Sequence, residues 1–273
     1  MTDRYAVIGN PVAHSKSPEI HSIFARETGQ DIAYERILAP LDRFSATINA
    51  FRDGGGKGAN VTVPFKLEAF GFTRTRSSRA TACGAVNTMR FDADGVYGDN
   101  TDGVGLVRDI ERNLGVRING RQILLLGAGG AARGVVGDLL NAGAARVTVA
   151  NRTHARAEKI ATTMRHAGAI EALQLDALHR RAFDIVINAT SASLANELPS
   201  VPESCFTGVT LAYDMVYGRD TPFLALAART GARAADGLGM LVEQAAEAFY
   251  VWRGVRPSTA PVIAQMRNLP QGT

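Results

Sequence analysis

The chain has 273 residues, of which 46% are hydrophobic and 21% charged, and it carries a formal net charge of +4. This composition is typical of a globular protein with one large domain or two smaller ones. The positive charge is small and spread along the chain, and no apolar run approaches the roughly 20 residues that span a bilayer, so we expect neither a nucleic-acid nor a membrane partner.

The two cysteines, Cys83 and Cys205, show neither metal-ligand spacing nor a disulfide framework. A strand-like segment begins within a few residues of the first residue and leaves no room for a signal peptide. We therefore expect a cytoplasmic protein without a metal site.

The first hundred residues alternate between strand-like and helix-like segments. We expect strands at 5–9, 32–38 and 59–63, helices at 17–29 and 41–55, and a hairpin of 85–91 with 95–98. Ser17 is suited to cap the first helix and Gly29 to end it. The second helix would present one apolar face, formed by Leu41, Phe44, Ile48 and Phe51.

Residues 101–114 are predicted to form a capped helix that ends at Gly115 and could link two domains. Beyond it, strand and helix segments alternate again up to about Gly237. The strands are expected at 123–126, 146–150, 184–188 and 210–214. Such alternation is typical of a parallel sheet with right-handed crossovers. A helix at 238–251 and a short helix after Pro257 follow.

The stretch from Arg121 to Leu140 contains the most informative pattern. An apolar run at 123–126 is followed by a glycine-rich segment and then by apolar residues at helical spacing. This order matches the strand–turn–helix fingerprint of dinucleotide-binding folds. Gly127 would allow the tight turn, Gly129 would let the backbone approach a pyrophosphate, and the helix N-terminus would face its phosphates. The alternative is an ordinary glycine-rich turn.

The end of the next strand indicates which dinucleotide is bound. An NAD site carries an Asp or Glu there, which binds the ribose 2′-hydroxyl. Here the strand ends in Asn151-Arg152-Thr153, with Arg156 one helical turn later, and no carboxylate is present. Two guanidinium groups suit a 2′-phosphate, so we predict NADP rather than NAD. The alternative is an ordinary helix start, where Arg is unfavourable without an anion.

Several polar segments could carry chemistry, and each also has a purely structural interpretation. Lys66 follows the strand that contains Asn60 and Thr62, so its side chain can lean into a cleft, or it is a surface lysine. Asp102 can be a helix cap. Asn87 lies in or just before a strand.

Together these segments resemble the shikimate dehydrogenase family. The matching stretches run through nearly the whole chain: GNPVAHSKSP (9–18), ANVTVPFK (59–66), GAVNT (84–88), GDNTDG (98–103), GAGGAA (127–132), NRT (151–153), NATS (188–191), YDMVY (213–217) and DGLGMLVEQAA (236–246). The resemblance implies an α/β protein with two domains. Residues 1–103, completed by C-terminal helices within 238–273, would form a three-layer substrate domain, and residues 104–237 a doubly wound, Rossmann-type NADP domain.

The resemblance also implies the role of each site residue. The catalytic pair would be Lys66 and Asp102. The substrate would be bound by Ser15, Ser17, Asn60, Thr62, Asn87, Tyr217 and Gln244. NADP would be bound by Gly127, Ala128, Gly129, Gly130, Ala131, Asn151, Arg152, Thr153, Arg156, Met215 and Gly239. Ser78 stands where the family often has an acidic residue, so one cofactor-side contact is not carried over.

The implied activity is the reversible, NADPH-dependent reduction of 3-dehydroshikimate to shikimate in aromatic amino-acid (chorismate) biosynthesis. In it, a Lys ammonium could stabilise the developing alkoxide and donate a proton, with a carboxylate holding it in place. One alternative is a broader quinate/shikimate dehydrogenase, or one that uses NAD. Another is a catalytically silent nucleotide sensor, against which the presence of both Lys66 and Asp102 argues. Either a monomer or a homodimer is compatible with the sequence.

Overall fold

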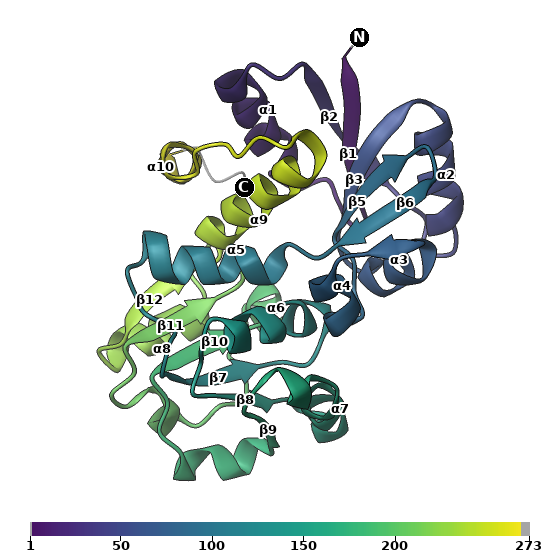
Figure 1. Ribbon diagram of the computed structural model, residues 1–273. Helices are drawn as coiled ribbons and strands as arrows, with labels where there is room; N and C mark the ends of the chain where they lie inside the picture. The colour runs from purple at the N-terminus through teal and green to yellow at the C-terminus, as the bar shows by residue number, and fades with distance from the viewer. Residues whose placement is uncertain (1, 269–273) are drawn as a thin grey trace. The chain divides into compact units, whose positions relative to one another are not determined.

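The structure is a computed structural model that describes residues 2–268. It divides into two compact units (Figure 1). The first comprises the chain up to Gly105 together with Val242–Met266, and the second comprises Leu106–Leu241 with Arg267 and Asn268. Residue 1 and residues 269–273, which were included in the predicted substrate domain, lie outside the described residues.

The first unit is built on a six-stranded sheet with the order β2-β1-β3-β5-β6-β4. Its strands are β1 (Asp3–Gly9), β2 (Ile32–Leu38), β3 (Gly56–Val61), β4 (Thr75–Arg76), β5 (Thr88–Asp92) and β6 (Gly95–Asp99). β1 pairs in parallel with β2 and β3, whereas β5 is antiparallel to both β3 and β6. The carboxyl ends of β1, β3 and β6 therefore lie at the same end of the sheet as the beginning of β5.

Helices cover both faces of this sheet, so the first unit has three layers. They are α1 (Ser17–Thr28), α2 (Phe44–Asp53), α3 (Lys66–Phe72), α4 (Ser78–Cys83), and the parts of α9 (Leu238–Arg253) and α10 (Ala260–Asn268) that belong to this unit. On one face, Ile8 and Val61 of the sheet share a core with Phe44 of α2 and Phe65 just before α3.

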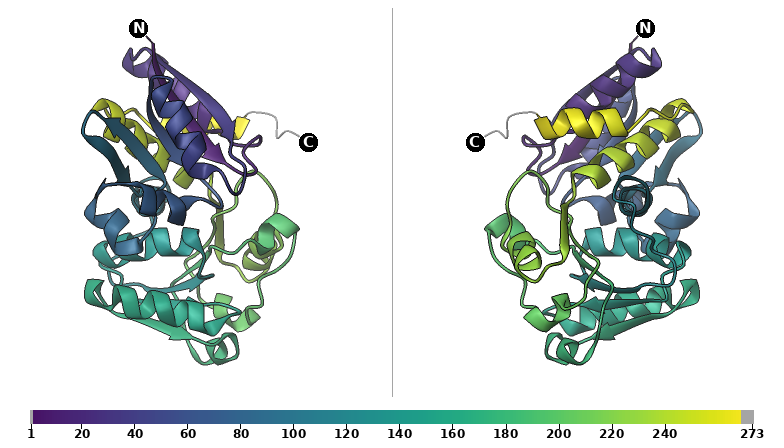
Figure 2. Two further views of the ribbon diagram at one scale, coloured as in Figure 1. Left: turned by 90° about the vertical axis from the view of Figure 1, so that its right-hand side faces the viewer. Right: turned by 90° about the vertical axis from the view of Figure 1, so that its left-hand side faces the viewer.

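The other face of this sheet is covered by both ends of the chain. In the right-hand view of Figure 2, the C-terminal helices, in yellow and yellow-green, lie in front of the sheet on the same side as α1, in purple. Phe24 of α1 packs edge-on against Phe249 of α9, with ring centroids 5.8 Å apart. Tyr5 of β1 stacks on Trp252 of α9 at 4.6 Å. The first unit is thus completed only by residues that follow the second one in the chain.

The second unit is built on a six-stranded parallel sheet with the order β12-β11-β10-β7-β8-β9. Its strands are β7 (Gln122–Leu126), β8 (Arg146–Ala150), β9 (Ile170–Leu173), β10 (Ile185–Asn188), β11 (Leu211–Asp214) and β12 (Arg233–Asp236). The strand order reverses between β7 and β10. This is the doubly wound arrangement of Rossmann-type folds, in which ligands bind outside the carboxyl ends of the strands at the reversal.

The chain enters this sheet through α5 (Asp102–Arg108), which begins in the first unit and continues as a π-helical segment (Asp109–Asn113) before β7. The parallel strands are then connected by α6 (Gly130–Asn141), α7 (His154–Met164), α8 (Pro222–Arg229), and 3₁₀ turns at Arg165–Ala167, Leu175–Arg180, Ala192–Ala195 and Glu203–Phe206. On one face of the sheet, Leu124 and Val186 share a core with Phe206 and Phe223. Within residues 2–268, no helix is both long and apolar enough to cross a membrane.

The predicted α/β class and most predicted elements are confirmed, and several differ in detail. Ser17 does not cap α1, because the helix already begins at Ser17 and the capping residue is Lys16. Gly29 ends the helix in a left-handed conformation with φ of 65°, as predicted. Leu41 does not belong to the apolar face of α2 and is 67% exposed, because residues 40–43 form a turn that delays the helix until Phe44.

The region after β3 was also predicted incorrectly. β3 ends at Val61 because residues 62–65 form a turn, in which the Phe65 N–H donates to the Thr62 carbonyl, and Lys66 then begins α3 instead of ending a strand. Five further elements were not predicted from the sequence: α3, β4, α4, β9 and β12. These are short, and they lack the run of β-branched residues or the full helical period that would reveal them.

Candidate active site

The carboxyl end of the first sheet gathers polar residues that were predicted to bind the substrate or to act in catalysis. Lys66 begins α3 after the turn that follows β3, Asn87 immediately precedes β5, and Asp102 begins α5 after β6. Because β3 and β6 end where β5 begins, the antiparallel register brings these three residues together although they are distant in sequence. The structure therefore assembles one polar cluster there.

Lys66 and Asp102 form the centre of this cluster. Nζ of Lys66 lies 2.5 Å from Oδ2 of Asp102, and their side chains are 16% and 8% exposed. Asn87 Nδ2 donates to the other carboxylate oxygen, Oδ1, at 2.8 Å. The Asp102 N–H donates to the side chain of Asn100. Lys66 is therefore not an ordinary surface lysine, since it is largely buried and fixed against a carboxylate whose two oxygens are both engaged.

A continuous chain of hydrogen bonds connects this pair to the loop after β1. From Asp102 it runs through Asn87 and Thr88 to Asn60, with successive contacts of 2.8, 2.9 and 3.1 Å. Tyr34 of β2 then donates its hydroxyl hydrogen to Asn60 Oδ1 at 2.7 Å. The Tyr34 hydroxyl also hydrogen-bonds the side chain of Ser17. The polar side chains thus form one network and not isolated pairs.

The network ends at the two serines of the loop after β1. The Ser15 hydroxyl lies 3.2 Å from the Ser17 hydroxyl, and the Ser17 N–H donates to Ser15 Oγ at 3.3 Å. Arg36 of β2 holds this loop through two hydrogen bonds to the Ser15 carbonyl and an ion pair with Glu19. Two hydroxyls are therefore presented side by side at the start of α1.

The remaining substrate-side residues lie in three different elements. Thr62, in the turn after β3, comes so close to Gly9 that a Cβ on Gly9 would lie 2.3 Å from the Thr62 methyl group. Gln244 of α9 accepts a hydrogen bond from the Thr101 hydroxyl at 3.4 Å, which connects it to the cluster. Tyr217 follows β11 in the second unit and is half-buried.

The sequence analysis did not single out Tyr34, Thr88 or Thr101, although all three belong to this network. Thr88 and Thr101 stand inside the matching stretches GAVNT and GDNTDG, so these motifs were the signal for them. Tyr34 carries no such signal. It is one polar position of an alternating strand, and only the pairing of β2 with β1 places it over Asn60.

An aromatic stack lies beneath Tyr34. The His21 ring is fully buried and stacks on the Tyr34 ring at 4.3 Å. Burial lowers the pKa of His21 to about 3, and the neighbouring Asn60 amide offsets only part of this effect. Burial also raises the pKa of Tyr34 well above its usual value. His21 is therefore neutral and Tyr34 remains a hydrogen-bond donor across the physiological pH range.

The predicted cofactor residues all lie at the carboxyl end of the second sheet. Gly127 follows β7 with φ of 108°, and a Cβ there would lie 2.9 Å from the Ala189 carbonyl, so only glycine fits this turn. Gly129 caps α6 and Gly130 begins it, and a Cβ on either would meet no atom within 4 Å. Ala128 lies in the turn, and Ala131 lies in the first turn of α6. Open space in front of a helix N-terminus suits a diphosphate.

The end of β8 carries the predicted 2′-phosphate contacts. Arg152 and Arg156 are both exposed, and neither forms an ion pair within residues 2–268. Between them, Thr153 caps α7, and Asn151 Nδ2 donates to its carbonyl at 2.9 Å. Two unpaired guanidinium groups at a helix N-terminus repel each other and the helix dipole, and a phosphate group would relieve both effects.

The last two predicted cofactor residues follow β11 and β12. The loop after β11 contains Met215 and is fixed by Asp214, which is fully buried. The Asp214 carboxylate accepts hydrogen bonds from Ser193 Oγ at 2.6 Å and Thr221 Oγ1 at 2.8 Å. Gly239 lies in the first turn of α9, which directly follows β12.

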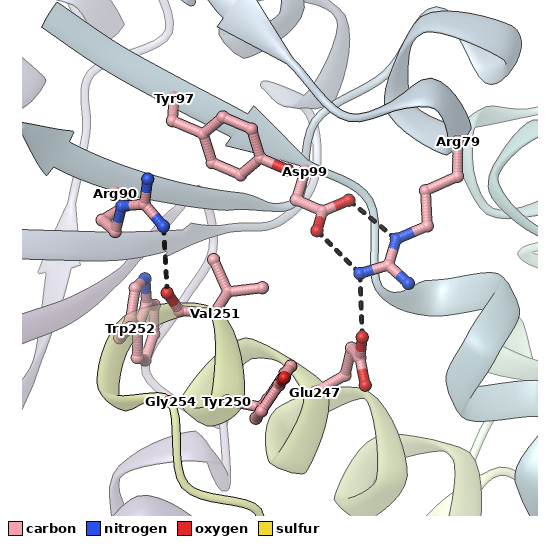
Figure 3. Close-up of a pocket in the computed structure, with 9 residues that line it drawn as sticks. All are labelled: Arg79, Arg90, Tyr97, Asp99, Glu247, Tyr250, Val251, Trp252 and Gly254. Carbon is pink, nitrogen blue, oxygen red and sulfur yellow. Dashed lines mark hydrogen bonds and ion pairs between the residues drawn. The ribbon is translucent and has the colours of Figure 1, made fainter.

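A separate cavity of about 640 Å³ lies in the first unit between the β5–β6 hairpin and α9 (Figure 3). None of the predicted site residues lines it. Its central charges pair with one another, since Arg79 binds Asp99 through two contacts of 2.7 Å and Glu247 at 3.0 Å. The two carboxylates raise the pKa of Arg79 despite the opposing effect of burial. Ser78, which precedes Arg79, begins α4. The arrangement fastens α4, β6 and α9 together.

Three family models match the chain in succession. Residues 7–89 match the shikimate dehydrogenase substrate binding domain, residues 109–197 match shikimate / quinate 5-dehydrogenase, and residues 237–267 match the shikimate 5′-dehydrogenase C-terminal domain. The boundary between the two units at Gly105 lies in the stretch between the first two models, residues 90–108.

Individual relatives match over almost the full length. The shikimate dehydrogenase (NADP(+)) of Herminiimonas arsenicoxydans is 58% identical over 268 residues, which cover 98% of both chains. Among solved structures, an Ael1 enzyme from Pseudomonas putida is 48% identical with a TM-score of 0.93, covering 99% of this chain and 100% of the other. The Thermus thermophilus shikimate 5-dehydrogenase in complex with NADP(H) and shikimate is 32% identical with a TM-score of 0.88, covering 97% and 99%. The chain therefore belongs to the shikimate dehydrogenase family.

Proposed function

We propose that the protein catalyses the reversible NADPH-dependent reduction of 3-dehydroshikimate to shikimate, a step of aromatic amino-acid biosynthesis through chorismate. The observation that carries this proposal is the Lys66–Asp102 pair at one end of a hydrogen-bond network that also contains Ser17, Asn60 and Asn87. The named activity of relatives up to 58% identical supports it.

We assign the substrate to the first unit. The hydroxyls of Ser15 and Ser17, which lie side by side at the start of α1, would bind the substrate carboxylate. Asn60, Thr62, Asn87 and Gln244 would bind the ring hydroxyls, since amide and hydroxyl groups can both donate and accept hydrogen bonds. Tyr217 would add a hydroxyl from the second unit.

Lys66 would act as the general acid. Reduction of the ketone adds a hydride to the carbonyl carbon and a proton to its oxygen, and the Lys66 ammonium can deliver that proton while stabilising the negative charge on the oxygen. Asp102 would keep the ammonium oriented, because one of its oxygens contacts Nζ and the other is held by Asn87. In the reverse direction, neutral Lys66 would accept the proton of the substrate hydroxyl.

We assign NADP to the second unit, where the residues fit such a group. The segment from Gly127 to Ala131 would hold the diphosphate, and Asn151, Arg152, Thr153 and Arg156 would hold the adenosine 2′-phosphate. Met215 and Gly239 would flank the nicotinamide. NADPH supplies the hydride when it is bound.

Two buried cysteines without a disulfide suit a reducing cytoplasm, our proposed location.

The experiment follows NADPH consumption by absorbance with the purified protein and 3-dehydroshikimate. Parallel assays replace this substrate by 3-dehydroquinate, or NADPH by NADH, and Lys66→Ala serves as the matched inactive control. We expect rapid consumption only with NADPH and 3-dehydroshikimate. A kcat/KM with 3-dehydroquinate or with NADH above the value for 3-dehydroshikimate and NADPH would support the broader quinate/shikimate activity. No consumption of cofactor in any pairing would refute the proposal. Size-exclusion chromatography of the same sample would distinguish a monomer from a homodimer.

A further inference from the structure

A buried acid and a buried phenol meet in the second unit, and neither is among the predicted site residues. The Tyr213 hydroxyl donates to Oδ2 of Asp109 at 2.6 Å, and the two residues are 0% and 3% exposed. Asp109 begins the π-helical segment that continues α5, and Asn113 Nδ2 donates to its Oδ1 at 3.0 Å. π-Helical turns are rare and are found most often at functional sites.

This pair touches the first turn of α9. A Cβ placed on Gly239 would lie 1.9 Å from Oδ1 of Asp109, so the carboxylate is in contact with the glycine backbone. The backbone of Met240, the next residue, hydrogen-bonds the Tyr213 phenol. The first N–H groups of a helix have no partner within it, so Tyr213 satisfies one of them while Asp109 places a negative charge at the positive end of α9.

The turn before α9, at Gly237, contacts the loop that follows β11, the strand that contains Tyr213. Tyr213 is followed in the chain by Asp214 and Met215, and a Cβ on Gly237 would lie 2.3 Å from the Met215 carbonyl. The Gly237 N–H donates to the Val216 carbonyl at 3.2 Å. The backbone segments that carry Met215 and Gly239 are thus packed tightly, and neither Gly237 nor Gly239 has room for a side chain.

We propose that Asp109 and Tyr213 are positioning residues. They fix the backbone of Gly239, against which the nicotinamide packs. This inference rests on the proposed function, which places Gly239 beside the nicotinamide. Neither residue touches a reacting atom in this account. Burial and the adjacent carboxylate both raise the pKa of Tyr213 well above its usual value, so the phenol remains a hydrogen-bond donor at neutral pH.

The first test is Tyr213→Phe, which keeps the ring in the core and removes only the hydroxyl. Misplacing a reacting group by about 1 Å can cost on the order of 100-fold, so we expect kcat to fall about 10- to 100-fold. The KM for 3-dehydroshikimate should stay nearly constant. The primary isotope effect on kcat with NADPH deuterated at the transferred position should rise, because hydride transfer becomes slower. Tyr250→Phe, at an exposed tyrosine of α9, is the matched control.

A second test uses Asp109. Asp109→Asn keeps an oxygen that can accept from Tyr213 and should retain much more activity than Asp109→Leu, which has similar size but no acceptor. Gly239→Ala introduces the close contact with Oδ1, and shortening Asp109 to Ala makes room for it. In the cycle formed by Gly239→Ala, Asp109→Ala and the double variant, we expect the fold-loss of kcat in the double variant to be far smaller than the product of the two single fold-losses.

The outcomes separate this inference from the proposed function. If the unmodified protein binds NADPH but does not reduce 3-dehydroshikimate, the proposed function fails, and the emission of the bound nicotinamide still reports whether Tyr213→Phe changes its surroundings. The inference is overturned if Tyr213→Phe leaves kcat, the isotope effect and this emission unchanged. It is also overturned if Tyr213→Phe lowers activity only in proportion to a loss of folded protein, with an unchanged isotope effect. The third contrary result is a double variant of Gly239→Ala and Asp109→Ala whose loss of kcat equals the product of the two single losses.

Discussion

Asn87 donates from Nδ2 to one oxygen of Asp102 at 2.8 Å and leaves the other oxygen to Lys66. The carboxylate is therefore held from two sides, and its orientation toward the ammonium is fixed before a substrate arrives. We predict that Lys66→Ala lowers kcat by 10²- to 10⁴-fold with a modest change in KM, since a positioned proton donor typically contributes about 3–5 kcal/mol to the barrier. Steady-state kinetics of the purified variant measure this.

The role of Asp102 is tested on a single Asp102→Asn sample, by kcat and by melting temperature. The new amide would turn its NH₂ group either toward Lys66 or toward the Asn87 donor, so we expect kcat to fall strongly, and the Lys66→Ala/Asp102→Asn double variant to lose much less than the two losses combined. If Asp102 were only a helix cap, its loss would cost about 1 kcal/mol of stability and leave kcat nearly intact. A lower melting temperature with full activity would therefore remove Asp102 from the mechanism.

Cofactor choice should depend on Arg152 and Arg156. Replacing both by Ala should weaken NADPH binding much more than NADH binding, because only NADPH carries the 2′-phosphate. Each lost charged hydrogen bond should cost about 1.5–3 kcal/mol. Titration of both cofactors against both proteins measures the difference, and Arg165→Ala, at the exposed C-terminal end of α7, is the control. Equal losses for the two cofactors would show that these arginines do not bind the 2′-phosphate.

Recognition of the substrate carboxylate should depend on Ser15 and Ser17. We predict that the Ser15→Ala/Ser17→Ala variant raises the KM for 3-dehydroshikimate by at least about tenfold, the effect of losing hydrogen bonds to a charged group, while the affinity for NADPH stays unchanged. Kinetics at varied substrate and cofactor concentrations give both values. Ser45→Ala, at an exposed serine of α2, should behave like the unmodified protein. An unaltered KM would exclude both hydroxyls from substrate binding.

Acid should destabilise the protein through His21. Its pKa is about 3 in the folded state, against about 6.5 in an unfolded chain, so below pH 6.5 the unfolded state binds the proton and the folded state does not. The free energy of unfolding should therefore fall by about 1.4 kcal/mol per pH unit from this group between pH 6.5 and 3, and the effect should be absent above pH 6.5.

Denaturant unfolding at a series of pH values measures this effect in the unmodified protein and in His21→Phe, which keeps the stack on Tyr34. The variant should show the shallower pH dependence, and their difference isolates the one proton. The same substitution at the exposed His166 controls for the added phenyl ring. Parallel pH profiles for the unmodified protein and His21→Phe would contradict the assignment.

Local patterns in the sequence predicted the elements around the glycine-rich turn well, because they are close together in the chain. The strand, the turn at Gly127 and the helix after it lie within 20 residues, and the glycine requirement there is a backbone property that the sequence itself displays. β8 has the predicted bounds, Arg146–Ala150, and the two arginines follow it directly. Here sequence order and spatial order coincide.

The substrate side was predictable only through motifs. Lys66 and Asp102 are 36 residues apart, and no periodicity indicates that they meet, because their contact depends on the antiparallel pairing of β5 with both β3 and β6. The contact of Tyr34 with Asn60 likewise depends on a register between strands. Nor does any local pattern indicate that Gly239 is required by a carboxylate 130 residues earlier, since that requirement arises only in the folded core.

The packing of Trp252 on β1 and β3 has a consequence for the order in which the chain can fold during synthesis. A Cβ on Gly58 would lie 2.6 Å from Nε1 of Trp252, and that nitrogen donates to the Met89 carbonyl at 2.9 Å, so the sheet of the first unit has a place shaped for this one indole. At a few to twenty residues per second, a ribosome that has released Gly105 needs on the order of ten seconds to deliver α9. During that interval Tyr5 lacks Trp252 and Phe24 lacks Phe249, while residues 106–241 of the second unit are synthesised. One face of the first sheet therefore stays partly exposed until α9 has been synthesised.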